Sequence, residues 1–155
     1  MMVFVPIALP SALALRDGEA LPPRRAFAAT SSLRRALGAA TDDEEADFAV
    51  LDTAGVAALD GLAGARRLVL AVEVSDDQVD DRRTDLGDVE VRDVRWRQVQ
   101  ALFADEESAG PAVVAAASAS SGVPLTSAFD LPAVVQLTEG HDLLWYAPEE
   151  LDGLR

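Results

Sequence analysis

Residues 66–74, RRLVLAVEV, constrain the fold of this chain more than any other stretch. Apolar residues occupy every second position on one face, at Leu68, Leu70, Val72 and Val74. Val69 and Ala71 keep the other face apolar, and only Glu73 interrupts it. A strand that is apolar on both faces is typical of a sheet that is covered on both sides. The stretch therefore predicts a central strand, buried between the two main helices of the chain.

The rest of the chain alternates between strand and helix patterns. Period-two patterns predict longer strands at residues 3–9, 99–103 and 143–147, and shorter strands near 25–29 and 89–91. Capping and helical periodicity predict helices at residues 11–16, 33–37 and 42–63, and another that begins at 105–107. Thr41 and Glu44 have the spacing of a capping box. Residues 75–88 and 118–127 are predicted to be loops, and residues 133–137 fit either a helix or a short strand.

This order of elements favours an α+β fold, in which a ferredoxin-like split βαβ sheet carries extra short strands. An open doubly wound α/β sheet is the alternative. A right-handed crossover through the helix at 42–63 predicts that the strands at 3–9 and 66–74 run parallel. A length of 155 residues suits a single globular domain spanning residues 1–155.

Composition excludes several classes of function. The chain has no Cys, and all 13 of its basic residues are Arg, which excludes disulfides, thiolate nucleophiles and lysine Schiff bases. The formal net charge of -14 argues against nucleic acid and anionic membrane as partners, because each would be repelled. The apolar start of the chain contains Pro6 and Pro10 and is too short to span a bilayer. We therefore expect a cytoplasmic protein, and we predict no cofactor and no metal.

The run HDLLWYAPEEL at residues 141–151 is the most distinctive part of the sequence. Together with VFVPIALP at 3–10, DDEEADF at 42–48 and RRLVLAVEV at 66–74, it resembles a family of small uncharacterised proteins from high-GC bacteria, domain of unknown function 6912. The resemblance implies a single domain in a bacterial cytoplasm. It transfers no catalytic role to any residue.

Two isolated candidates for chemistry have plainer structural interpretations. His141 is the only imidazole and is a candidate general base, but adjacent residues of a strand point to opposite faces, so Asp142 is badly placed to orient it. Trp96, between Arg95 and Arg97, is a candidate for gripping a planar anion. We favour a structural His141 and a core Trp96 flanked by two solvated guanidinium groups. The acidic groups at predicted helix starts are assigned to capping rather than to metal binding.

The segment Thr30–Arg35 is the leading candidate for a ligand site. A helix N-terminus offers free backbone N–H groups, to which hydroxyl and guanidinium groups add. The segment supplies such groups at Thr30, Ser31, Ser32, Arg34 and Arg35. Residues 16–35 hold five Arg against Asp17 and Glu19, a local net charge of +3 in an acidic protein. The structural interpretation is still favoured: a capped helix whose Arg side chains pair with the acidic helix at residue 42.

Three hypotheses of function follow. The first is a non-enzymatic binding or self-assembly module, which forms a homo-oligomer through an open face or edge of its sheet. The second is an enzyme or sensor for a small phosphate or carboxylate at Thr30–Arg35. The third is an acidic partner for a basic protein, suggested by the net charge.

Overall fold

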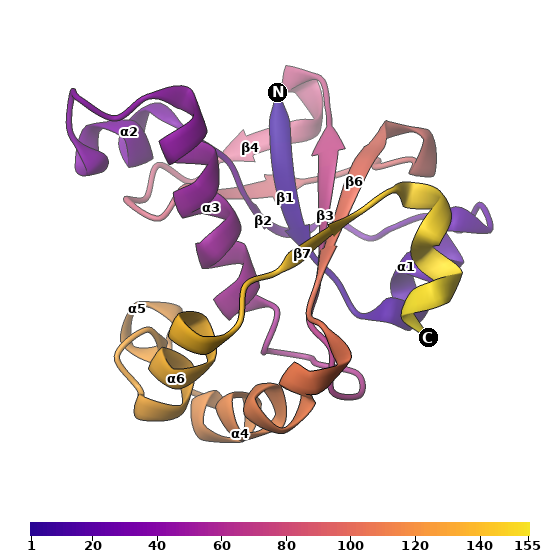
Figure 1. Ribbon diagram of the computed structural model, residues 1–155. Helices are drawn as coiled ribbons and strands as arrows, with labels where there is room; N and C mark the ends of the chain where they lie inside the picture. The colour runs from indigo at the N-terminus through magenta and orange to yellow at the C-terminus, as the bar shows by residue number, and fades with distance from the viewer.

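A buried strand, β3 (Leu68–Glu73), occupies the interior of the sheet, as the pattern of residues 66–74 predicts. The computed structural model describes residues 1–155 (Figure 1). The other strands are β1 (Met2–Pro6), β2 (Arg24–Phe27), β4 (Val79–Asp81), β5 (Asp88–Val91), β6 (Val99–Ala104) and β7 (Leu144–Tyr146). The α-helices are α1 (Leu9–Arg16), α2 (Ser31–Leu37), α3 (Asp43–Ala57), α4 (Gly110–Ser120), α5 (Leu125–Ala128) and α6 (Pro132–Gly140). Short 3-10 helices are η1 (Asp76–Gln78), η2 (Trp96–Gln98), η3 (Glu107–Ala109) and η4 (Pro148–Leu154).

All seven strands form one sheet in the order β4-β5-β2-β1-β3-β6-β7. Every neighbouring pair is antiparallel. The prediction of an α+β fold is confirmed. The alternative of a doubly wound α/β sheet is wrong, because that fold is built on parallel strands joined by helical crossovers.

The predicted parallel pairing of strands 3–9 and 66–74 is also wrong. β1 and β3 are antiparallel neighbours, with Phe4 opposite Ala71. Because β2 is antiparallel to β1 as well, β2 and β3 run parallel on either side of it. The crossover through α2 and α3 therefore joins β2 to β3, and β1 lies between them. Apolar alternation gives no information on strand direction, since side chains alternate in the same way in both directions.

The two faces of the sheet carry separate apolar clusters. On one face, Leu70 and Leu102 pack with Leu15 of α1 and Leu151 of η4. On the other face, residues such as Phe27 pack against α3. The C-terminal 3-10 helix, rather than the second main helix, therefore completes the cover of the sheet, which corrects the expectation that the two main helices enclose β3.

The second main helix, α4, belongs to a third cluster. Figure 1 shows α4, α5 and α6 gathered beyond one end of the sheet, next to the C-terminal end of α3. Val113 and Ala116 of α4 are buried there with Val134 and Leu137 of α6. Ala-rich α4 is apolar nearly all round and has no distinct apolar stripe to lay on a sheet, and it packs instead among other helices.

Local boundaries differ from prediction at both ends of α3. The capping box is formed by Asp42 and Glu45 rather than by Thr41 and Glu44. Glu45 N donates to Asp42 Oδ1 at 2.8 Å, and Asp42 N donates to Glu45 Oε2 at 3.2 Å. The sequence places an acceptor at both Thr41 and Asp42, so spacing alone does not choose between them. The helix ends at Ala57 instead of residue 63.

Two predicted loops contain regular structure. Residues 118–127 include the end of α4 and the beginning of α5, and residues 75–88 include η1 and β4. Residues 133–137, which fitted a helix or a strand equally, lie within α6. Burial explains the structure around α5 and α6, because Ala128 and Val134 lie inside the third cluster. In the mostly exposed segment 75–88, β4 forms because it pairs with β5. Tertiary contacts thus decided the secondary structure of segments whose own patterns were too short or too polar to predict it.

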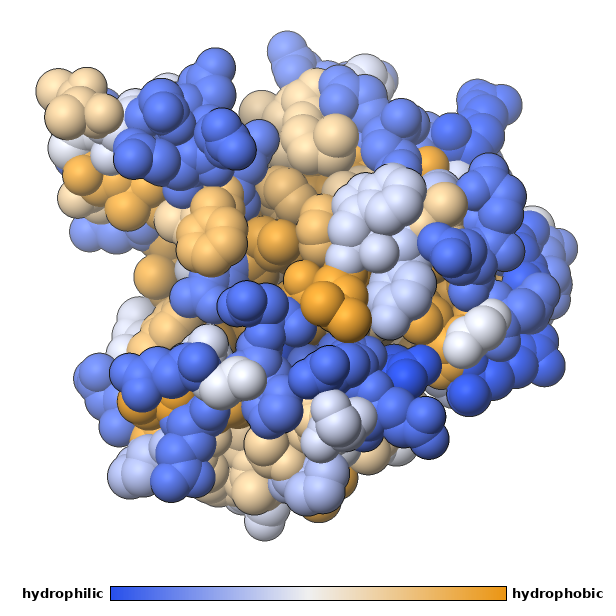
Figure 2. Space-filling view, viewed as in Figure 1, coloured by the Kyte–Doolittle hydropathy of each residue, from blue (hydrophilic) through white to orange (hydrophobic).

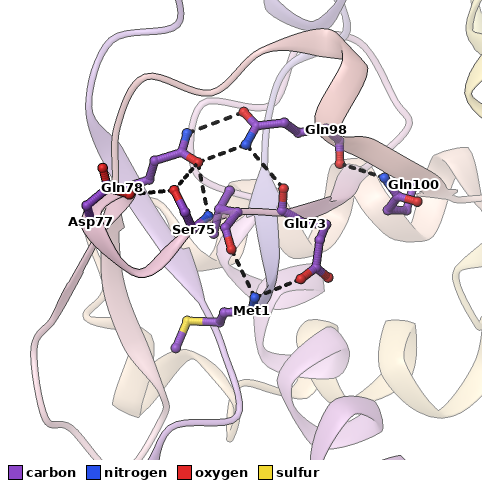
Figure 3. A network of polar contacts seen from close by, with 8 residues as sticks. Met1, Glu73, Ser75, Asp77, Gln78, Gln98 and Gln100 are labelled. Carbon is purple, nitrogen blue, oxygen red and sulfur yellow. Dashed lines mark hydrogen bonds and ion pairs between the residues drawn. The ribbon is translucent and has the colours of Figure 1, made fainter.

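Two short turns at one end of the sheet share a polar network (Figure 3). In η1, Ser75 N donates to Gln78 Oε1 at 3.1 Å, and in η2, Arg95 N donates to Gln98 Oε1 at 2.9 Å. Gln98 Nε2 then donates to Gln78 Oε1 at 2.8 Å and to Glu73 O at 3.2 Å. The two Gln side chains therefore cap their own turns and fasten both turns to the end of β3.

Gln98→Leu is expected to lower the free energy of unfolding by about 1–3 kcal/mol, because it leaves Arg95 N without its acceptor and removes the bonds from Gln98 to Gln78 and Glu73. Urea denaturation measures the loss. Gln100→Leu is the matched control: its side chain is exposed and makes one bond, to Gln98 O at 3.2 Å. We expect a change within about 0.5 kcal/mol for the control. Equal losses for the two variants would show that the network does not stabilise the turns.

Candidate anion-binding cleft

A cleft of about 280 Å³ lies where the C-terminal end of α3 and the α4–α5 connection meet the sheet. We call it the Arg24 cleft. Half of its 12 lining residues are apolar. The apolar lining includes Phe27, Val56, Val123 and Leu125. The charged and hydroxyl groups come from Arg24, Arg25, Asp60 and Ser120. An apolar pocket with a few convergent polar groups is the usual form of a small-molecule site.

Arg24, the first residue of β2, is half-buried and lines both this cleft and a second hollow beside α1, which Leu15 and Glu19 also line. Its guanidinium forms no ion pair with any carboxylate of the chain. Burial lowers the pKa of Arg24, which means that the surroundings disfavour its charged form. Arginine nevertheless keeps its proton at neutral pH. A bound anion would compensate the desolvated charge and so would be stabilised at this position.

Arg25 is held differently from Arg24. Its Nε donates to Asp88, whose side chain is almost fully buried. The guanidinium carbon lies 5.1 Å from the centroid of the Phe27 ring, within the range of a cation–π contact. Arg25 is thus fixed in place by a carboxylate and a ring, while its charge is largely neutralised. Of the two Arg residues that line the cleft, only Arg24 has no carboxylate partner.

The α4–α5 connection contributes another wall of the cleft. Ser120 Oγ donates to Ala116 O at 2.8 Å, so its hydroxyl proton is already used. Gly122 has φ +73°, a conformation that favours glycine, and a Cβ there would meet no atom within 4 Å. The backbone at Gly122 is therefore open to a ligand. Asp60 also lines the cleft, and its charge would confine an anion to the Arg24 side.

The segment Thr30–Arg35 is occupied with contacts inside the protein. Thr30 is buried, and its Oγ1 accepts a hydrogen bond from Leu33 N at 3.2 Å, which caps α2. Arg34 Nε donates to Ala29 O at 3.3 Å, and its NH1 group pairs with Asp43 Oδ1 at 2.8 Å. These contacts are those of the favoured structural interpretation, a capped helix paired with the acidic start of α3. The remaining predicted residues, Ser31, Ser32 and Arg35, lie at or near the surface and form no ion pair.

His141 and Trp96 lie apart from the Arg24 cleft. His141 Nδ1 is 3.2 Å from Glu106 Oε1, so the carboxylate that orients it is not Asp142. Trp96 is partly buried against the cluster that contains Leu70, while the flanking residues Arg95 and Arg97 are exposed. The structure therefore does not bring the predicted site residues together. No group of three or more acidic or histidine side chains converges on one point where a metal ion could bind.

No sequence pattern predicted the buried ion pair between Arg67 and Asp105. Arg67 NH2 lies 2.8 Å from Asp105 Oδ1, and Asp105 Oδ2 accepts bonds from Arg67 N at 2.8 Å and Nε at 2.9 Å. The side chains are 3% and 0% exposed. Gly55 of α3 makes room for the pair, since a Cβ there would lie 3.2 Å from Arg67 NH1. A charged residue at the start of an otherwise apolar strand is the only local signal, and it does not name its partner.

Comparisons with known proteins give a family and no named relative. No helix combines the length and the apolar character needed to cross a bilayer. No curated protein matches the chain, and no solved structure matches it. The model of a family of unknown function, DUF6912, matches residues 1–154, nearly the whole chain. This protein therefore belongs to the family of unknown function DUF6912.

Proposed function

We propose that this protein is a binding module for a small anionic ligand, a phosphate or a carboxylate, held in the Arg24 cleft. The observation that carries the proposal is the half-buried residue Arg24, which lines the cleft and whose guanidinium has no carboxylate partner. Guanidinium groups bind carboxylate and phosphate through paired hydrogen bonds. The apolar part of a ligand would rest on Phe27 and Leu125.

The proposal is one of binding without catalysis. Arg24 does not exchange protons near neutral pH, and the Ser120 hydroxyl donates to a backbone carbonyl rather than to a base. The proposal keeps the ligand class that the sequence suggested for Thr30–Arg35. It moves the site to Arg24, because Arg34 already pairs with Asp43.

Addition of inorganic phosphate or acetate is expected to raise the thermal midpoint of the wild-type protein. A ligand that binds the folded state alone stabilises it by about 2.7 kcal/mol at 100 times its dissociation constant. Arg24→Met is expected to remove this stabilisation while keeping most of the apolar stem of the side chain. Differential scanning fluorimetry detects the shift, and isothermal titration calorimetry measures the affinity.

Arg35→Met is the matched control, because Arg35 is exposed, forms no ion pair and lies outside the lining of the cleft. Its response to phosphate should equal that of the wild type within error. The double variant Arg34→Ala plus Arg35→Ala tests the site predicted from the sequence. A phosphate response that survives Arg24→Met and disappears in this double variant would place the ligand at Thr30–Arg35 and overturn the proposal.

A further inference from the structure

An exposed apolar surface lies between α3 and β7. Phe48 of α3 is 69% exposed and Trp145 of β7 is 62% exposed. Figure 2 shows apolar residues gathered between these two elements, with hydrophilic residues around them. We call this surface the α3–β7 face, and define it by Phe48, Phe103, Leu143 and Trp145. Large exposed aromatic side chains within an apolar surface are unusual on a protein that has no partner.

The contacts join these side chains into one surface. Phe103 is directly opposite Trp145 in the β6–β7 pairing, so both lie on the same face of the sheet. Leu143 stands two residues before Trp145 and lines a small depression together with Phe48. Phe103 and Leu143 are themselves only partly buried. A bound side chain could therefore touch the helix and the strand at once.

Carboxylates without cationic partners surround the α3–β7 face. Glu44 and Asp52 lie one turn before and after Phe48 on α3, and Asp142 precedes Leu143. None of the three forms an ion pair. Burial raises the pKa of Asp52, and the neighbouring Asp142 adds to the shift although Arg67 opposes it. A cation placed between Asp52 and Asp142 would relieve this repulsion.

We propose that the α3–β7 face binds a basic amphipathic segment of a partner protein. Apolar side chains of the partner would cover Phe48 and Trp145, and its Lys or Arg side chains would meet Asp52, Asp142 and Glu44. The aromatic rings add cation–π attraction for the same basic groups. A second copy of this chain fits less well, because a two-fold contact would place these carboxylates against their own counterparts in a chain of net charge -14.

The proposed surface is independent of the Arg24 cleft. The two sites share no lining residue, and Phe48 and Val56 lie eight residues apart on α3, which is about 12 Å along the helix axis. Variants of one surface should therefore leave the other intact. Phosphate stabilisation serves as the check that a docking variant is folded.

The test uses a fluorescently labelled synthetic helical peptide of about four turns, with Leu on one face and Lys on the other. Its binding to the whole protein is followed by anisotropy. We expect the wild type to bind it, with an affinity that falls as salt rises. Phe48→Ser plus Trp145→Ser should weaken binding by about tenfold or more, because aromatic anchors dominate such interfaces. Phe48→Ser alone, at the most exposed of these positions, should give a smaller loss in the same direction.

Two matched controls separate the surface from general attraction. Val114→Ser removes a half-exposed apolar side chain from α4 and should change affinity by less than about twofold. Asp52→Asn plus Asp142→Asn should weaken binding more than Asp85→Asn plus Asp130→Asn, which removes the same charge from exposed positions elsewhere. The proposal is overturned if the two charge variants weaken binding equally, or if a peptide with Glu in place of Lys binds as tightly. A wild-type dimer in sedimentation that Phe48→Ser dissociates would overturn it as well, since the occupant would then be a second copy.

Discussion

Asp105→Asn is expected to lower the free energy of unfolding by about 3–5 kcal/mol, the usual result of breaking a buried ion pair by removing one partner. The exchange keeps the shape of the side chain. It leaves Arg67, whose side chain is 3% exposed, with a buried charge and no anion to balance it. The same carboxylate accepts Arg67 N at 2.8 Å, so the start of β3 also loosens from the end of β6. Chemical denaturation followed by circular dichroism measures the loss.

Two comparison variants make this prediction specific. Arg67→Met plus Asp105→Leu removes both charges and should cost less than Asp105→Asn alone, because no unpaired ion remains. Glu90→Gln breaks a pair of exposed residues, Glu90 and Arg82 at 2.9 Å, and should cost at most about 1 kcal/mol. If Asp105→Asn were no more costly than Glu90→Gln, the buried pair would not stabilise the fold.

Leu70→Ala is expected to lower the free energy of unfolding by about 2–5 kcal/mol. Leu70 is fully buried in the middle of β3, inside the cluster that α1 and η4 cover. Truncation removes apolar contact area and leaves a cavity that the surrounding strands cannot fill without moving. Guanidinium chloride denaturation gives the change from the shift of the midpoint at constant slope.

Leu37→Ala is the matched control for this substitution. Leu37 lies at the end of α2 and is 40% exposed, so its truncation should change stability by no more than about 0.5 kcal/mol. If Leu70→Ala were as mild as Leu37→Ala, β3 would not be the buried centre of the sheet.

Both proposed surfaces include residues of the long helix α3. Its buried side, with Val50 and Ala54, packs on the sheet. Val56, near its C-terminal end, lines the Arg24 cleft, and Phe48, two turns earlier, lines a depression with Leu143. A ligand in the cleft and a partner on the α3–β7 face would therefore contact the same helix at two places along its length.

The sequence by itself determined the features that depend on near neighbours. Alternation over residues 66–74 identified the buried strand, and acidic residues after position 41 located the start of α3 to within one residue. Both signals act over a few residues, through side-chain direction and through the free N–H groups of a helix end. The predicted pairing of Arg34 with the start of the acidic helix also depends on residues that are close in sequence.

Only the tertiary structure decided strand direction, the partner of Arg67 and the location of the candidate site. Arg67 and Asp105 are 38 residues apart, and the Arg24 cleft combines two strands with the end of α3 and the α4–α5 connection. The pattern around Arg24 shows a basic residue at the start of a short strand, with no sign that its charge is half-buried. Burial of a charge depends on what the rest of the chain packs against it, and that is a property of the assembled fold rather than of any local stretch.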